Sequence, residues 1–142
     1  MSVGLVLGSF TLATPALAYI CPTNDLCAYD WVNWNSAGGV WVVSYATIDA
    51  QSGDCMTLPN VGAHFNNGVN VDNRITSWTI NQMGGTHDLI EFYALGNCNT
   101  GSGLGLSADA NPGDEENDMT NSIVGNFNDD VTSIHICKNC QP

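Results

Sequence analysis

The chain has 142 residues and a formal net charge of −12, because fourteen acidic residues face only two basic ones, Arg74 and Lys138. Nucleic acids and anionic membrane surfaces need positive charge on a protein partner, so both are excluded as partners. The length suits one domain with a modest core. We expect the protein to be a monomer.

The first eighteen residues have the composition of an export signal. Residues 3–18 carry no charge, are mostly apolar and end in the small-x-small tripeptide Ala-Leu-Ala. Two threonines and Pro15 interrupt the apolar run, which argues against a transmembrane anchor. We therefore predict a signal peptide over residues 1–18, secretion to the extracellular space, and a single mature domain over residues 19–142.

Short β-rich runs alternate with clusters of Gly, Asn, Asp and Ser along the mature part, which is the signature of an all-β fold. The predicted strands, in chain order, are 26–29, 40–45, 55–58, 77–80, 89–93, 103–106 and 132–137. The predicted loops are 33–39, 62–70, 83–87, 97–102 and 108–117, with one helical turn over 118–124.

All six cysteines lie in the predicted mature part, and an even number in a short exported chain predicts disulfides. They are Cys21, Cys27, Cys55, Cys98, Cys137 and Cys140, and their pairing stays open. The last two form a C-x-x-C, which in a cytosolic protein can be a redox or zinc motif. At the end of an exported chain without a second such motif, we predict bridges that tie the tail to the body.

Two hexapeptides have the same form, [Asp/Asn]-[Asp/Asn]-x-x-Thr-Ser with an aliphatic fourth residue. They cover residues 72–77 and 128–133, and alternating apolar residues follow each. Calcium takes six to eight oxygen ligands, and such a turn clusters carboxylate, amide and hydroxyl oxygens. The pair predicts a calcium site; the alternative is that both are ordinary turns that lead into strands.

The chain also shows a longer internal repeat. Tyr29 is followed five residues on by Trp34, and Tyr93 is followed five residues on by Cys98. Together with the hexapeptides, these positions outline two units, at about 26–80 and about 89–137, with about four strands each. One unit alone would leave a sheet face bare, so we predict two Greek keys that share one core in a β-sandwich.

These motifs resemble the βγ-crystallin family. Its Greek-key unit begins with an aromatic-x4-aromatic-x-Gly hairpin and ends in [Asn/Asp]-[Asn/Asp]-x-x-[Ser/Thr]-Ser. Both terminal motifs match in full, whereas Ser36 replaces the Gly of the first hairpin, and Cys98 and Thr100 replace the second aromatic residue and the Gly of the second. The cysteine-bearing tails look like the secreted, disulfide-containing branch, which includes bacterial metalloproteinase inhibitors and yeast killer toxins.

The resemblance implies up to two calcium ions, each held crosswise between the two Greek keys. Side-chain oxygens would come from Asn73, Thr76, Asp129 and Thr132, and backbone carbonyls from Arg74 and Asp130, while Asp72 and Asn128 brace the turns. Arg74 places a cation beside one site and Asp130 adds negative charge near its own, so we expect two unequal sites of modest affinity.

Other chemistry is weaker in the sequence. The three histidines lack zinc-ligand spacing, and we expect His135 to face solvent on its strand. Glu91 is predicted to be an exposed strand residue, and the acidic run 114–118 a solvated loop. The aromatic stretch 31–45 is expected to fill the core, although solvent-facing rings could stack on sugars.

We therefore predict a secreted, non-enzymatic βγ-crystallin-like protein that binds calcium and is stabilised by calcium and disulfides. The alternative is a protease inhibitor or a killer-toxin-like antimicrobial effector on the same fold, with an extracellular protein target. A third hypothesis, a carbohydrate-binding module, depends on the aromatic stretch alone.

Overall fold

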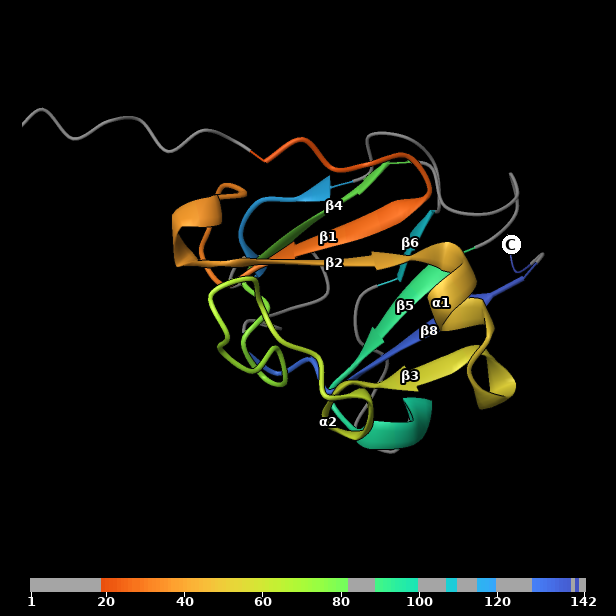
Figure 1. Ribbon diagram of the computed structural model, residues 1–142. Coiled ribbons are helices and arrows are strands. Elements are labelled where there is room, and N and C mark those ends of the chain that lie inside the picture. The colour runs from red at the N-terminus through yellow and green to blue at the C-terminus, as the bar shows by residue number, and fades with distance from the viewer. Residues whose placement is uncertain are drawn as a thin grey trace, which may run out of the picture.

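Two antiparallel sheets face each other in the computed structural model (Figure 1). The structure describes residues 19–81, 89–99, 107–109, 115–119, 129–138 and 140. One sheet has the order β2-β1-β4-β7, formed by Val40–Ser44, Asp25–Tyr29, Ser77–Asn81 and Glu115–Glu116. The other has the order β3-β8-β5-β6, formed by Cys55–Thr57, Ser133–Cys137, Leu89–Tyr93 and Ser107–Asp109.

Short helical segments connect the strands at the ends of the sandwich. The α-helices are α1, Tyr45–Asp49, and α2, Leu58–Val61. The 3-10 helices are Ser36–Gly38, Ser52–Asp54 and Gly96–Cys98. None of the described helices is long and apolar enough to cross a membrane.

The third strand of each half belongs to the sheet of the other half. Strand β3 pairs with β8, where Met56 lies opposite Ile134. Strand β7 pairs with β4, where Trp78 lies opposite Glu116. In each sheet the other three strands come from one half and lie in the same order: the second strand of that half, then its first, then its fourth. The two halves therefore repeat one Greek-key pattern. The predicted all-β Greek-key sandwich is confirmed.

The core forms because alternate strand residues point to the space between the sheets. Ile90 and Phe92 of β5, and Ile134 and Ile136 of β8, are at most 1% exposed. Phe92 stacks on Trp78 of the opposite sheet, with ring centroids 5.4 Å apart and planes at 28°. Such an aromatic pair adds about 1 kcal/mol beyond the burial of its area.

Two predicted strands end early because helix-starting signals follow them. The strand predicted over 40–45 ends at Ser44, whose Oγ accepts a hydrogen bond from Thr47 N at 3.2 Å and caps α1. The strand predicted over 55–58 ends at Thr57, because Pro59 favours the first turn of α2.

The predicted loop 108–117 is wrong in part, since it contains the end of β6 and the whole of β7. The expected solvated run 114–118 likewise includes β7, whose two residues extend the edge of the first sheet. The predicted strand 103–106 and loop 83–87 lie outside the described residues, as does most of the helical turn predicted over 118–124.

All six cysteines form disulfides, as predicted, in the pairs Cys21–Cys27, Cys55–Cys98 and Cys137–Cys140. The Cys55–Cys98 bond joins β3 of the first half to a 3-10 helix of the second. The expected tail-to-body bridge is wrong, because the C-x-x-C closes on itself. Charge holds the tail instead, since the Lys138 ammonium pairs with Asp49 and lies 3.4 Å from Asp54.

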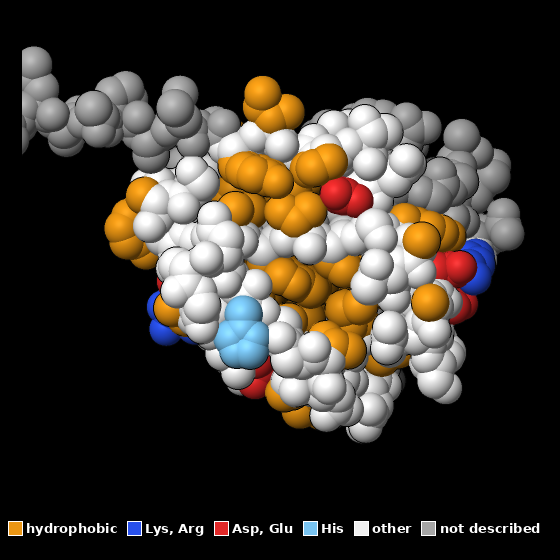
Figure 2. Space-filling model, in the orientation of Figure 1, with side chains coloured by type: hydrophobic (Ala, Val, Ile, Leu, Met, Phe, Trp, Pro, Cys, Tyr) orange, Lys and Arg blue, Asp and Glu red, His pale blue; other side chains and the backbone are white. Residues whose placement is uncertain are grey.

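The seam between the edge strands β2 and β3 is open to solvent. Figure 2 shows apolar side chains gathered there, above His64. A groove of about 290 Å³ runs along the seam, with Trp41, Val43, Met56 and Val61 among its lining residues. The two sheets therefore do not meet along this seam, and part of the apolar interior is in contact with solvent.

We predict that the two longer-range disulfides contribute unequally to stability. Chain-entropy arguments give about 4 kcal/mol for the Cys55–Cys98 bond, with a sequence separation of 43, and about 2 kcal/mol for Cys21–Cys27, with a separation of 6. Urea unfolding of the Cys55→Ala/Cys98→Ala and Cys21→Ala/Cys27→Ala variants measures both. Equal losses would contradict the view that Cys55–Cys98 is the main covalent link between the halves.

Candidate metal centre

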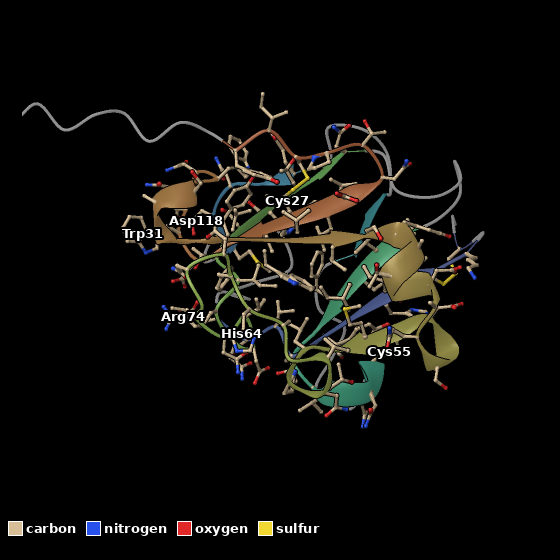
Figure 3. The ribbon with its side chains drawn as sticks, in the orientation of Figure 1. Cys27, Trp31, Cys55, His64, Arg74 and Asp118 are labelled. Carbon is tan, nitrogen blue, oxygen red and sulfur yellow. A yellow bond between two sulfur atoms is a disulfide. The ribbon has the colours of Figure 1, made fainter. Side chains whose placement is uncertain are left out.

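The two hexapeptide turns meet at one end of the sandwich. The Asn73 N–H donates to the Val131 carbonyl at 2.9 Å, and the Asp129 N–H donates to the Ile75 carbonyl at 3.4 Å. Arg74, which belongs to the first turn, lies at this end in Figure 3, and Cys55 lies toward the other. The backbone thus brings together two segments that are far apart in the sequence.

The second position of each turn has a left-handed backbone. Asn73 has φ 54° and Asp129 has φ 58°. Among residues with a side chain, Asn and Asp adopt this region most readily. The conformation alone therefore accounts for an Asx residue at the second position, as the ordinary-turn hypothesis expects, and leaves its side-chain oxygen available for other contacts.

Those side-chain oxygens reach across to the opposite turn. Thr132 Oγ1 donates to Asn73 Oδ1 at 3.0 Å. Thr76 Oγ1 lies 3.0 Å from the Asp30 carbonyl and 3.4 Å from Asp129 Oδ1. Oxygens that share one calcium ion at 2.3–2.6 Å lie about 3 Å from one another, so these hydrogen-bonded oxygens are close enough together to share an ion.

A buried oxygen in the first turn lacks a partner. Asp72 Oδ1 is buried and forms no hydrogen bond within the part of the chain that the structure describes. A buried carboxylate oxygen without a partner is costly, and a bound cation would offset that cost. Of the other residues predicted for the site, Asp130 is exposed and Asn128 lies outside the described residues.

Arg74 pairs with a buried carboxylate next to one of the two clusters. Its guanidinium donates to both Asp30 oxygens, Nε to Oδ1 at 3.1 Å and Nη2 to Oδ2 at 2.8 Å. The Asp30 side chain is only 8% exposed. The hydrogen bonds to Asp30, followed by the charges of Asp30 and Asp129, raise the pKa of Arg74. A permanent cation therefore lies beside the Thr76–Asp129 cluster.

The last residue of each hexapeptide holds the turn to the hairpin loop of its own half. Ser77 Oγ donates to the Trp31 carbonyl at 2.6 Å and accepts from Trp34 N at 3.2 Å. Ser133 Oγ donates to the Leu95 carbonyl at 2.6 Å and accepts from the Cys98 N–H at 3.0 Å.

The two hairpin loops also share their backbone conformation. Trp34 and Cys98, the residues that the sequence repeat aligned, both have positive φ, at 52° and 50°. The backbone N–H of each of these residues donates a hydrogen bond to the buried serine hydroxyl of its own half. The equivalence of the two hairpins thus extends from sequence to individual hydrogen bonds, although only one of them keeps the second aromatic residue.

A second polar cluster lies on the outer face of the other sheet, and sequence reasoning missed it. Glu91 is not an exposed strand residue, since its side chain is 17% exposed and accepts from Tyr93 Oη at 2.7 Å. His135 was expected to face solvent, and its side chain does lie on the outer face, where Nδ1 is 2.8 Å from Glu91 Oε2. Burial and the bond to Glu91 raise the pKa of Tyr93.

The aromatic stretch mostly packs against the protein. Trp41 and Tyr45 contact the main core, and Trp34 Nε1 donates to the Trp78 carbonyl at 3.1 Å. Trp31 is half exposed, and its ring lies against Gly38, where a Cβ atom would come within 2.5 Å. One exposed ring of the four is a small platform for sugar stacking.

Comparison with solved structures identifies the fold. A chain from a structure described as "Evolution of the eye lens beta-gamma-crystallin domain fold" is 15% identical, with 84% of this chain and 91% of that chain covered and a TM-score of 0.54. The N-terminal domain of protein S is 13% identical over 80% of this chain and 94% of its own, with a TM-score of 0.48. A βγ-crystallin domain from Flavobacterium johnsoniae is 17% identical over 82% and 98%, with a TM-score of 0.46.

No protein-family model and no curated protein matches the chain. The first of these structures is similar enough to compare the whole fold, and the chain has a βγ-crystallin-like fold, as the sequence motifs predicted.

We predict that each buried serine of the turns is needed for stability. Ser77→Ala and Ser133→Ala each leave a loop carbonyl and an N–H without their partner, at a cost of about 1–3 kcal/mol each. Chemical unfolding measures the loss, with the exposed Ser52→Ala as the matched control. A loss no larger than that of the control would contradict the role assigned to these hydroxyls.

Proposed function

We propose that the protein is a secreted, non-enzymatic, calcium-binding protein, in which calcium links the two Greek keys. The observation that carries the proposal is the crossed pairing of side-chain oxygens, Asn73 with Thr132 and Asp129 with Thr76. Each pair takes one oxygen from each half, so an ion bound there would add an interaction between the halves that the chain alone lacks.

The donor set suits a hard cation. Amide, hydroxyl, carboxylate and carbonyl oxygens are the ligands that calcium prefers, whereas zinc favours nitrogen and sulfur. One site would use Asn73 and Thr132, and Asp72, which precedes Asn73, has a buried oxygen without a hydrogen-bond partner in the described part of the chain. The other would use Thr76 and Asp129 with the Asp30 carbonyl. The backbone carbonyls of Arg74 and Asp130 complete the proposed ligand set.

Calcium would act mainly on stability. An ion that binds the folded state but not the unfolded chain stabilises the fold by mass action, and divalent cations also relieve the self-repulsion of a net charge of −12. The three disulfides and the apolar residues 1–18 support secretion, since disulfides persist in oxidising compartments. The hypothesis of a protease inhibitor or antimicrobial effector stays a prediction from the sequence resemblance.

We predict two calcium-binding events of unequal affinity, with dissociation constants of about 10⁻⁵ to 10⁻³ M. At ten times the dissociation constant, each site adds about 1.4 kcal/mol, which raises the melting temperature by a few degrees. Calorimetric titration and thermal unfolding of the oxidised protein measure stoichiometry and stabilisation. The Thr76→Ala/Thr132→Ala double change removes both effects, whereas Thr79→Ala, on the adjacent strand, retains them.

An unchanged melting temperature in millimolar calcium, or equal stabilisation of the double variant, would contradict the proposal.

We predict that Arg74 weakens the site beside it. A unit charge about 6 Å from a divalent ion costs roughly 1.4 kcal/mol at the dielectric constant of water, which is about a tenfold change in affinity. Arg74→Gln should therefore tighten one of the two binding events about tenfold. The same variant should be less stable without calcium, because the buried Asp30 carboxylate loses its partner.

Lys138→Gln is the matched control, since it removes the other cation of the chain, which pairs with Asp49 and Asp54 and not with the oxygen-rich turns. A variant of Arg74 with unchanged or weaker calcium affinity would overturn the assignment of this residue.

A further inference from the structure

The outer face of the sheet β3-β8-β5-β6 brings together a carboxylate, an imidazole and a sulfur. Glu91 and His135 lie directly opposite each other on β5 and β8, and Cys137 follows His135 by two residues on the same face of the strand. A ring nitrogen of His135, a carboxylate oxygen of Glu91 and Sγ of Cys137 all lie within 4.8 Å of one another. The ligand atoms of a tetrahedral zinc ion, about 2.0–2.3 Å from the metal, lie roughly 3.3–3.8 Å apart, so groups within this limit can reach one ion after small side-chain shifts.

Hydrogen bonds hold two of these groups in place. Glu91 Oε2 accepts from Tyr93 Oη at 2.7 Å and lies 2.8 Å from His135 Nδ1. The side chains of Glu91 and His135 are 17% and 24% exposed, so the cluster is sheltered and still open to solvent.

The sulfur is blocked, because Cys137 is bonded to Cys140. Metals bind the thiolate form of cysteine, so the oxidised protein lacks a sulfur ligand here. This disulfide has a sequence separation of 3, the shortest of the three bonds, and chain-entropy stabilisation is smaller for shorter loops. The ion pairs of Lys138 with Asp49 and Asp54 also hold this segment, and they do not depend on the disulfide. Opening it therefore costs the fold least.

We infer that reduction of the Cys137–Cys140 disulfide by a dithiol creates a zinc-class metal site with Cys137, Cys140, His135 and Glu91. The dithiol transfers two electrons and two protons to the sulfur–sulfur bond and becomes a disulfide itself. When the metal binds, the two protein thiols release two protons. Two thiolates with an imidazole and a carboxylate make a four-coordinate set that selects zinc over calcium.

This site is independent of the calcium proposal. Cys55 lies opposite His135 on β3, and Figure 3 shows it far from Arg74, which belongs to the first oxygen-rich turn. The two sites also differ in chemistry, because one offers hard oxygen ligands and the other offers soft sulfur and nitrogen. Failure of one proposal therefore leaves the other unaffected.

The first experiment frees Cys137 without a reductant. Cys140→Ser leaves Cys137 as a thiol while the other two disulfides stay closed. Cobalt(II), a spectroscopic substitute for zinc, is added under anaerobic conditions. We expect one equivalent to bind with the absorption bands of a cobalt–thiolate complex. The added change His135→Gln should weaken binding tenfold or more, and Cys137→Ser/Cys140→Ser should abolish the bands.

The second experiment uses the unaltered sequence and limited treatment with dithiothreitol. Alkylation and mass mapping identify the cysteines that are freed, and we expect Cys137 and Cys140 first, with cobalt binding and the circular dichroism of the folded state retained. The Cys21→Ala/Cys27→Ala variant should behave in the same way.

Three results would overturn the inference. They are the absence of thiolate bands from folded Cys140→Ser, persistence of the bands in the variant without Cys137 and Cys140, and unfolding of the protein before these two cysteines are freed.

Discussion

The exchange of third strands between the two sheets is the constraint on which the rest of this structure depends. Because β3 completes the sheet of the second half and β7 extends that of the first, neither half has its full sheet alone. Strands β4 and β8 begin at the last residues of the two hexapeptides, and backbone hydrogen bonds between the turns hold both at one end of the sandwich. Buried Ser77 and Ser133 then hold each turn to its hairpin by equivalent hydrogen bonds.

Charge is distributed so that each of the two basic residues has acidic partners. Arg74 neutralises Asp30 beside the oxygen-rich turns, and Lys138 joins the C-terminal segment to α1 through Asp49. The two halves are thus equivalent in backbone but not in charge. In one half, an internal guanidinium supplies part of the positive charge that a bound cation would supply, while the third position of the other turn carries Asp130. The symmetry of the fold therefore does not require symmetry of binding.

The two proposed sites differ in their cation chemistry because turns and strand faces present different groups. Turns concentrate oxygens from Asx, Thr and backbone carbonyls, which suit hard ions. A strand face places residues two apart beside the opposing residues of its neighbour, and here that geometry joins His135, Cys137 and Glu91. The first arrangement is visible as a motif, whereas the second has no motif because its members come from two strands.

Much of the fold could be predicted from the sequence, because alternation along strands and the preference of Asn and Asp for left-handed turns belong to each short segment by itself. These features predicted the sandwich, its repeat and the two oxygen-rich turns. Strand β7 could not be predicted, since Glu115 and Glu116 form a strand only through pairing with β4. The Arg74–Asp30 pair and the His135–Glu91 contact each join residues 44 apart. Segments that distant meet only after the strands have found their register, so these charge partners were decided by tertiary structure.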